Sequence, residues 1–164
     1  MEEIGVSVQL TAQDFVSGQM AFMRVVRKNP VLRVAIFFLA AGLLFGATVD
    51  WFAALPLIAL GGLFATGWVQ RSSLRRLFDK DPTMQERVSW RFGPAGYSTA
   101  MVGSESRNAW MRVRQVVVAR DVLVLSVGRG SMHIIPRNSF QPGQLEQVLR
   151  WCAAGGGPIT PSVA

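Results

Sequence analysis

The chain has 164 residues, which is room for one ordinary domain or for a membrane element and one small domain. Its residues are 50% hydrophobic and 16% charged, with a net charge of +7. A typical soluble domain has about 25% charged residues, so the composition favours a membrane protein. The single cysteine, Cys152, excludes a disulfide within the chain, and the single histidine, His133, argues against a His-rich metal site.

Residues 1–30 predict a strand followed by an amphipathic helix. Ile4 to Leu10 alternates weakly between apolar and polar residues, as a short strand does. Thr11 is then expected to be the N-cap of a helix, with Asp14 at its third position. This helix is able to lie on a membrane surface or to pack on the following domain, and the sequence leaves both alternatives open.

Two apolar stretches predict a transmembrane helical hairpin over residues 31–69, with spans at 31–48 and 51–69. The second stretch has no charged residue and would extend roughly 28 Å, close to a hydrocarbon core of about 30 Å. Val49 and Asp50 are expected to form the turn. Four small residues are expected to pack the two helices together, with a dimer face as the alternative: Gly42, Gly46, Gly61 and Ala65.

Basic residues flank both ends of the predicted hairpin, and a basic helix at the membrane is expected over residues 70–82. Because Lys and Arg mark the cytoplasmic side of a membrane protein, this distribution predicts that both termini are cytoplasmic. The lipid bilayer is then the first expected partner.

Residues 83–154 predict a cytoplasmic β-rich domain. Val88, Trp90 and Phe92 alternate in one strand, Val122 to Val127 forms another, and several turn signals lie between them. A C-terminal helix with one apolar face is expected to close the sheet, and residues 155–164 are expected to be a disordered tail. The predicted fold class is therefore an α+β membrane protein: a two-helix transmembrane hairpin plus a small antiparallel β domain closed by a C-terminal helix.

The order of these parts resembles the YcxB-like membrane proteins of bacteria over about residues 4 to 152. The residues that carry the resemblance are Phe92 to Gly96, Ser106, Trp110, Val122 to Leu125, Ile134 to Arg137 and Phe140. The resemblance implies a C-terminal domain that is pleckstrin-homology-like in outline and a location in the bacterial plasma (inner) membrane as a multi-pass protein. It implies no catalytic or binding residue.

No pattern of residues indicates a catalytic, cofactor-binding or metal site, so the protein is not expected to be an enzyme. The basic surface of the β-rich domain is the main functional indication. Arg112 and Arg114 are expected to share one strand face. The candidate contacts with anionic lipid or a partner are Arg112, Arg114, Arg129 and Arg137, while nucleic acid is not expected as a partner.

The sequence therefore predicts a membrane-anchored cytoplasmic interaction module without catalytic activity, which binds a protein partner or anionic lipid at the inner membrane surface. A homodimer is a further expected form of partnership. Tyr97 and Trp110 are candidate groove residues for the partner. The alternative is a subunit of a membrane enzyme or transport complex, which would need polar residues within the spans.

Overall fold

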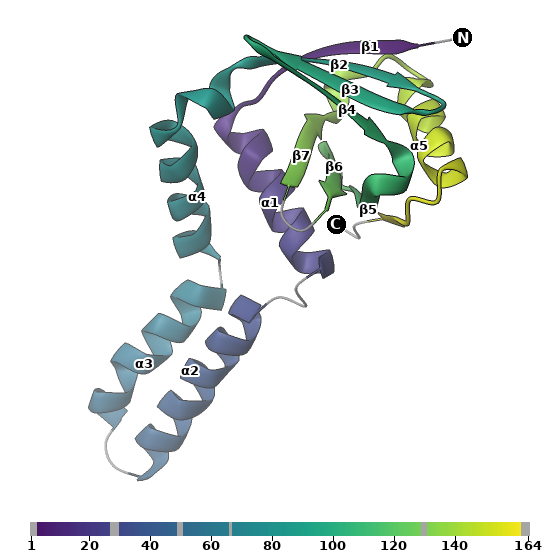
Figure 1. The fold of residues 1–164 in the computed structure, drawn as a ribbon. Coiled ribbons are helices and arrows are strands. Elements are labelled where there is room, and N and C mark those ends of the chain that lie inside the picture. Colours follow the sequence, from purple (N-terminus) through teal and green to yellow (C-terminus); the bar gives the residue numbers. More distant parts are fainter. Residues whose placement is uncertain (1–2, 27–29, 49–50, 66, 129–130, 162–164) are drawn as a thin grey trace.

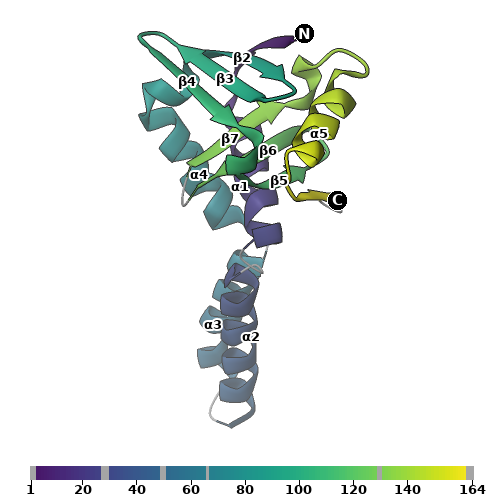
Figure 2. The same cartoon turned by 45° about the vertical axis from the view of Figure 1, so that its right-hand side comes forward.

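The computed structural model has an α+β fold in which two β-sheets form a body and a pair of helices projects from it (Figures 1 and 2). The structure describes residues 3–26, 30–48, 51–65, 67–128 and 131–161. These ranges hold two four-stranded sheets and five α-helices. The predicted turn at Val49 and Asp50 lies outside the described residues.

Sheet A is antiparallel and joins the N-terminal strand to three strands from the second half of the chain. Its strands, in spatial order, are β1 (Ile4–Gln9), β2 (Arg87–Gly93), β3 (Gly96–Met101) and β4 (Ser104–Ala109). Alternate residues are buried along β1 and along most of β2, which is the period of a strand with one face in a core. The predicted alternation of Val88, Trp90 and Phe92 is confirmed, because these residues turn toward the core.

Sheet B has the spatial order β7–β6–β5–β8. Its strands are β5 (Val113–Val118), β6 (Val122–Val127), β7 (Ser131–Pro136) and β8 (Ile159–Pro161). The first three pair in antiparallel fashion, whereas β8 runs parallel to β5. Residues 159–161 are therefore an ordered part of the sheet and not the disordered tail that the Gly- and Pro-rich sequence suggests.

The main core lies between the two sheets and is closed at one end by helix α5 (Gln144–Ala154). Leu145, Val148 and Cys152 lie on the buried face of α5, as the spacing of apolar residues predicts. The fully buried Trp110 begins the short 3₁₀ helix η2 (Trp110–Arg112), and its Nε1 donates a hydrogen bond to the carbonyl oxygen of Gly93 at 2.8 Å. This bond fastens the corner between the sheets to the end of β2.

Helix α1 (Ala12–Val26) packs on the outer face of sheet B, and helix α4 (Trp68–Lys80) packs against α1. Phe15 of α1 and Phe78 of α4 meet with their ring centroids 5.7 Å apart. The predicted N-cap is confirmed, because Asp14 N donates to Thr11 Oγ1 at 3.2 Å and Thr11 N donates to Asp14 Oδ2 at 3.1 Å. Of the two alternatives for this helix, the structure has the one in which it packs on the domain.

Helices α2 (Pro30–Thr48) and α3 (Trp51–Ala65) form the projecting pair (Figure 1). The apolar run 51–69, predicted as one span, does not form one helix. Gly67 adopts a left-handed conformation with φ of 65°, so α3 ends before it and α4 begins after it. A helix of 15 residues is about 22 Å long, which falls short of a hydrocarbon core of about 30 Å.

The prediction of a transmembrane hairpin is wrong. In the part of the chain that the structure describes, no helix combines the length and the apolar character that crossing a bilayer requires. This finding overturns the spans 31–48 and 51–69 and the membrane part of the predicted fold class. It also removes the basis for a multi-pass protein of the bacterial inner membrane with two cytoplasmic termini, and for residues 70–82 as a helix at the membrane.

The N-terminal strand is also not a separate region from the β-rich domain. The pairing of β1 with β2 runs from Ile4 opposite Phe92 to Gln9 opposite Arg87. The body therefore contains residues from both sides of the helical segment, where the sequence suggests separate regions at 1–30 and 83–154. A short 3₁₀ helix, η1 (Pro82–Gln85), leads from α4 back into β2, and Asp81 caps it through a bond from Thr83 N.

We predict that Gly18→Ala destabilises the protein because α1 lies close on sheet B at this point. A Cβ at Gly18 would lie 2.7–2.8 Å from three side-chain carbons of Ile134, so the helix or the strand must shift. Overpacking of this kind costs about 1–3 kcal/mol. The measurement is urea unfolding followed by circular dichroism.

Gly62→Ala is the matched control, since it makes the same change inside helix α3, where a Cβ would meet no atom within 4 Å. Replacing a helical Gly by Ala in open space is expected to stabilise by up to about 1 kcal/mol. Equal effects of the two substitutions would contradict the close packing of α1 on sheet B.

Candidate functional site

The arginines predicted as contact residues, as far as the structure describes them, come from different elements. Arg112 lies in η2 and Arg114 in β5, and the register of β5 against β6 shifts between Val113 and Gln115. The two side chains are exposed but do not occupy alternate positions of one strand, so the predicted shared face is wrong. Arg129 lies outside the described residues.

Arg137 has a structural role. Its Nη1 donates to the carbonyl oxygens of Ala119 and Arg120 at 3.3 and 3.2 Å, and its backbone N donates to Asp121 O at 2.8 Å. These bonds tie the start of the 3₁₀ helix η3 (Arg137–Ser139) to the turn between β5 and β6. The guanidinium is thus engaged with backbone carbonyls of the chain itself.

Tyr97 and Trp110, predicted as exposed groove residues, are buried with 3% and 1% of their surface accessible. They belong to the aromatic core between the sheets, where their ring centroids lie 5.5 Å apart. Their aromatic character therefore contributes to packing and not to an accessible groove.

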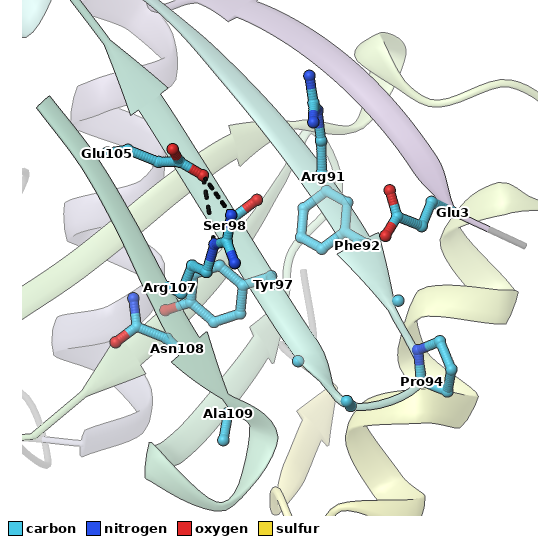
Figure 3. Close-up of a pocket in the computed structure, with 13 residues that line it drawn as sticks. Glu3, Arg91, Phe92, Pro94, Tyr97, Ser98, Glu105, Arg107, Asn108 and Ala109 are labelled. Atoms are coloured by element: carbon cyan, nitrogen blue, oxygen red, sulfur yellow. Dashed lines mark hydrogen bonds and ion pairs between the residues drawn. The ribbon is translucent and has the colours of Figure 1, made fainter. Parts of the chain in front are cut away.

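A hollow of about 410 Å³ lies on the outer face of sheet A, near the turn between β2 and β3 (Figure 3). We call this pocket the sheet A hollow. Its lining residues come from β2, the turn, β3 and β4, with Glu3 at the start of β1. In Figure 3, Arg91 and Arg107 stand on separate strands with β3 between them.

The hollow follows from the sizes of the residues in the cross-strand rows. One row runs Glu3, Gly93, Gly96 and Ala109, and the next runs Gly5, Arg91, Ser98 and Arg107. Gly93, Gly96 and Ala109 in the first row, and Ser98 between the two arginines in the second, are small and leave a depression beside the longer side chains of Glu3, Arg91 and Arg107. Close packing of the backbone also requires glycine at position 96, since an added Cβ would collide with the carbonyl oxygen of Asn108.

The charges around the hollow are mixed. Arg107 Nε donates to Glu105 Oε1 at 3.3 Å, and both side chains are largely exposed, so this ion pair positions the guanidinium more than it stabilises the fold. Arg91 is exposed and makes no ion pair with any residue that the structure describes. The arrangement suits a ligand with an anionic group near Arg91 and Arg107. The sequence does not single out these two arginines, although Arg91 lies between the inward-facing Trp90 and Phe92 of its strand.

A cluster of aromatic rings with polar groups is formed by the buried Trp90 and Tyr97 and the half-buried His133. The His133 ring lies edge-on to Trp90 and to Tyr97, with centroid distances of 5.2 and 5.8 Å. Trp90 Nε1 and Tyr97 Oη are buried and have no hydrogen-bond partner among the described atoms of the protein. Burial raises the pKa of Tyr97 far above its usual range, with a smaller contribution from Cys152, so the phenol stays protonated at neutral pH.

Cys152 is buried and takes part in no metal site among the residues that the structure describes. Burial raises the pKa of the Cys152 thiol to about 11, which keeps it protonated and unreactive. Within the described ranges, no three residues among His, Cys, Asp and Glu lie close enough to hold a metal ion.

The hairpin glycines face the interior of the helix pair. A Cβ at Gly42 would lie 2.8 Å from Ile58 Cγ1, and one at Gly61 would lie 2.7 Å from Leu39 Cγ. A Cβ at Gly46 would likewise meet the opposing helix. These small residues therefore bring α2 and α3 together within one chain.

The other sides of the hairpin are apolar and exposed. Phe37 has 68% of its surface accessible, Leu44 has 69% and Leu55 has 56%. Around them lie further exposed apolar residues of α2 and α3: Val34, Ile36, Leu43, Phe45, Trp51 and Leu60. The side chain of Ala65, the fourth predicted packing residue, lies outside the described part.

Comparison with known proteins returns no relative: no family model, no curated protein and no solved structure matches this chain. The resemblance to the YcxB-like proteins therefore stays a prediction, and function is argued from the geometry of the chain alone.

We predict that the protein loses stability as the pH falls below about 6.5, the ordinary pKa of histidine. Burial lowers the pKa of His133 in the folded state, so the unfolded chain takes up a proton at a higher pH than the folded chain. The neutral ring makes its full contribution to the free energy of unfolding above the pKa that His133 has in the unfolded chain. This contribution is lost as the pH falls through about 6.5 toward the lower pKa of His133 in the folded chain. Urea unfolding between pH 5 and 8 measures this.

His133→Gln is the control, because glutamine does not titrate in this range. The variant is expected to show a flatter pH dependence than the parent between pH 7 and 5. An identical slope in both proteins would show that other groups cause the loss.

Proposed function

We propose that this protein is an interaction module without catalytic activity of its own, and that it assembles with a second copy of itself through the α2–α3 hairpin. The observation that carries the proposal is the exposed apolar surface of the hairpin. The homodimer expected from the sequence is therefore proposed again, but the larger apolar side chains, and not the glycines, are proposed to form its interface.

The size of this surface supports an interface. The exposed parts of the large apolar side chains on α2 and α3 amount to on the order of 1,000 Å², whereas the largest apolar patch of an ordinary monomer is about 300–600 Å². A standard interface buries about 800 Å² on each partner. Because these side chains point to several sides of the hairpin, one further hairpin would cover a part of this area.

The chemistry of the surface also supports a second copy. Two hairpins side by side give four packed helices, in which Leu, Ile and Phe side chains fill the space between helices. The net charge of +7 makes two copies repel each other, yet the sequence from Pro30 to Ala65 contains only Arg33 and Asp50 as charged residues. The hairpin is the part of the chain where two copies approach at the least electrostatic cost.

We predict that Leu44→Gln and Phe37→Gln weaken self-association. Each substitution removes one exposed apolar side chain from both copies of the dimer, and burial of one such side chain is worth about 1.5–3 kcal/mol, so the dimer dissociation constant is expected to rise at least about 10-fold. Sedimentation velocity of the full chain in detergent-free buffer, over a range of concentrations, measures the effect.

Val102→Gln serves as the control, since Val102 is 90% exposed but lies in the turn between β3 and β4. Its dissociation constant is expected to equal that of the parent. A parent protein that is monomeric at all concentrations, or one that partitions into phosphatidylcholine vesicles in place of self-associating, would contradict the proposal.

A further inference from the structure

We infer that the sheet A hollow binds a small carboxylic acid with a flat aromatic body, and that Arg91 and Arg107 bind its carboxylate. Figure 3 shows the labelled side chains that surround this site. The hollow lies on the body of the protein and does not depend on the hairpin, so ligand binding here is additional to the proposed self-association.

The anionic group of the ligand is indicated by the row of residues that contains both cations. Arg91, Ser98 and Arg107 lie side by side on three neighbouring strands. Neighbouring strands are about 4.8 Å apart, so the two arginine backbones are about 10 Å apart. Glu105 accepts from Nε and Nη2 of Arg107, which leaves Nη1 open among the described residues. A carboxylate above Ser98 is therefore within reach of two guanidinium groups and one hydroxyl, all of which are hydrogen-bond donors.

The flat body of the ligand is indicated by the next row, toward the turn between β2 and β3. Gly93, Gly96 and Ala109 form this part of the floor, and a Cβ at Gly93 would meet no atom closer than Glu3 Cγ at 3.9 Å. Because glycine has no side chain, a flat ring is able to lie directly on the backbone of the sheet. Two rows on one face are about 7 Å apart along a strand, so a short aromatic acid reaches from Ser98 to the glycines.

The volume of the hollow sets the size of the ligand. The hollow holds about 410 Å³, which lies at the lower end of the range of about 300–1,000 Å³ found for small-molecule sites. Such sites combine an uncharged floor with a few polar groups that fix the orientation of the ligand. Here the glycine row supplies the floor, and the row of Arg91, Ser98 and Arg107 supplies the polar groups.

Glu3 limits the ligand to one carboxylate. It lines the hollow beside Gly93, at the end of the glycine row, and forms no ion pair with a residue that the structure describes. A second carboxylate at the far end of a ligand would lie close to this acid and would be repelled. The hollow is therefore expected to prefer a monocarboxylate to a dicarboxylate, although the net charge of +7 would favour the dicarboxylate.

The test uses the full chain and 2-naphthoate, which has two fused rings and one carboxylate. Backbone amide NMR spectra during a titration identify the contacted residues, expected within 91–98 and 105–109, and give a dissociation constant expected on the order of 1 mM. 2-Naphthamide has the same rings without the charge and is expected to bind about fivefold more weakly. Naphthalene-2,6-dicarboxylate is expected to bind more weakly than 2-naphthoate because of Glu3.

The variants Arg91→Gln and Arg107→Gln are each expected to weaken the binding of 2-naphthoate about two- to fivefold, because each removes one exposed charge contact. Arg87→Gln is the matched control, since it removes the same charge from the same face of β2 outside the hollow. The dissociation constant of Arg87→Gln is expected to equal that of the parent.

Gly93→Leu fills the glycine row without changing the charge and is expected to abolish the binding of 2-naphthoate. Ser7→Leu adds the same side chain to an exposed position on the same face of sheet A, outside the hollow, and is expected to bind as the parent does. Thermal midpoints show that both variants are folded. Leu44→Gln, in the hairpin, should also bind normally, which separates this site from the proposed dimer interface.

Several results would overturn the inference. One is equal affinity for 2-naphthoate and 2-naphthamide. Tighter binding of the dicarboxylate, or an equal loss of affinity in Arg87→Gln and Arg91→Gln, would show an effect of net charge only. Inorganic phosphate that binds at the same amides with the affinity of 2-naphthoate would show that the aromatic body has no role. Amide shifts confined to α2 and α3 would place the probe on the apolar hairpin.

Discussion

The pairing of β1 with β2 is the constraint on which the remaining architecture depends. It joins residues 4–9 to residues 87–92, with the whole helical segment between them. Because Gln9 lies opposite Arg87, α1 leaves sheet A and α4 returns to it at the same end. The hairpin must then project from one end of the body, as Figures 1 and 2 show. Loss of this pairing would release Ile4, Val6 and Val8 of β1 from the core between the sheets.

Strand β2 couples the core to the sheet A hollow. Its inward residues, Trp90 and Phe92, pack in the aromatic core, while Arg91 between them projects from the opposite face. Trp110 adds the hydrogen bond to Gly93 O that fixes the end of β2. The position of Arg91 is therefore set by the packing of its neighbours in the core.

Local patterns predicted the local elements and failed where long-range contacts decide the outcome. The alternation of Val88, Trp90 and Phe92 and the 3.6-residue spacing of Leu145, Val148 and Cys152 were sufficient, because burial sets both periods. The parallel pairing of β8 with β5 cannot be predicted from neighbouring residues in the sequence. The apolar run 51–69 likewise gives no indication that Gly67 adopts a left-handed conformation, which ends helix α3. Hydropathy alone could not distinguish the roles of the arginines. Arg137 bonds backbone carbonyls of the turn between β5 and β6, whereas the pairing of β2 with β3 leaves Arg91 on the exposed face of sheet A.

The division of charge along the chain allows the two proposed surfaces to act independently. The hairpin is nearly free of charge, and the arginines of the hollow lie on sheet A, at the end of the body away from the hairpin (Figure 1). Charge–charge interactions between exposed groups fade over about 10 Å at ordinary ionic strength, so a ligand in the hollow hardly changes the hairpin contact. A dimer held by its hairpins therefore offers two hollows, each of which binds its ligand without altering the interface between the copies.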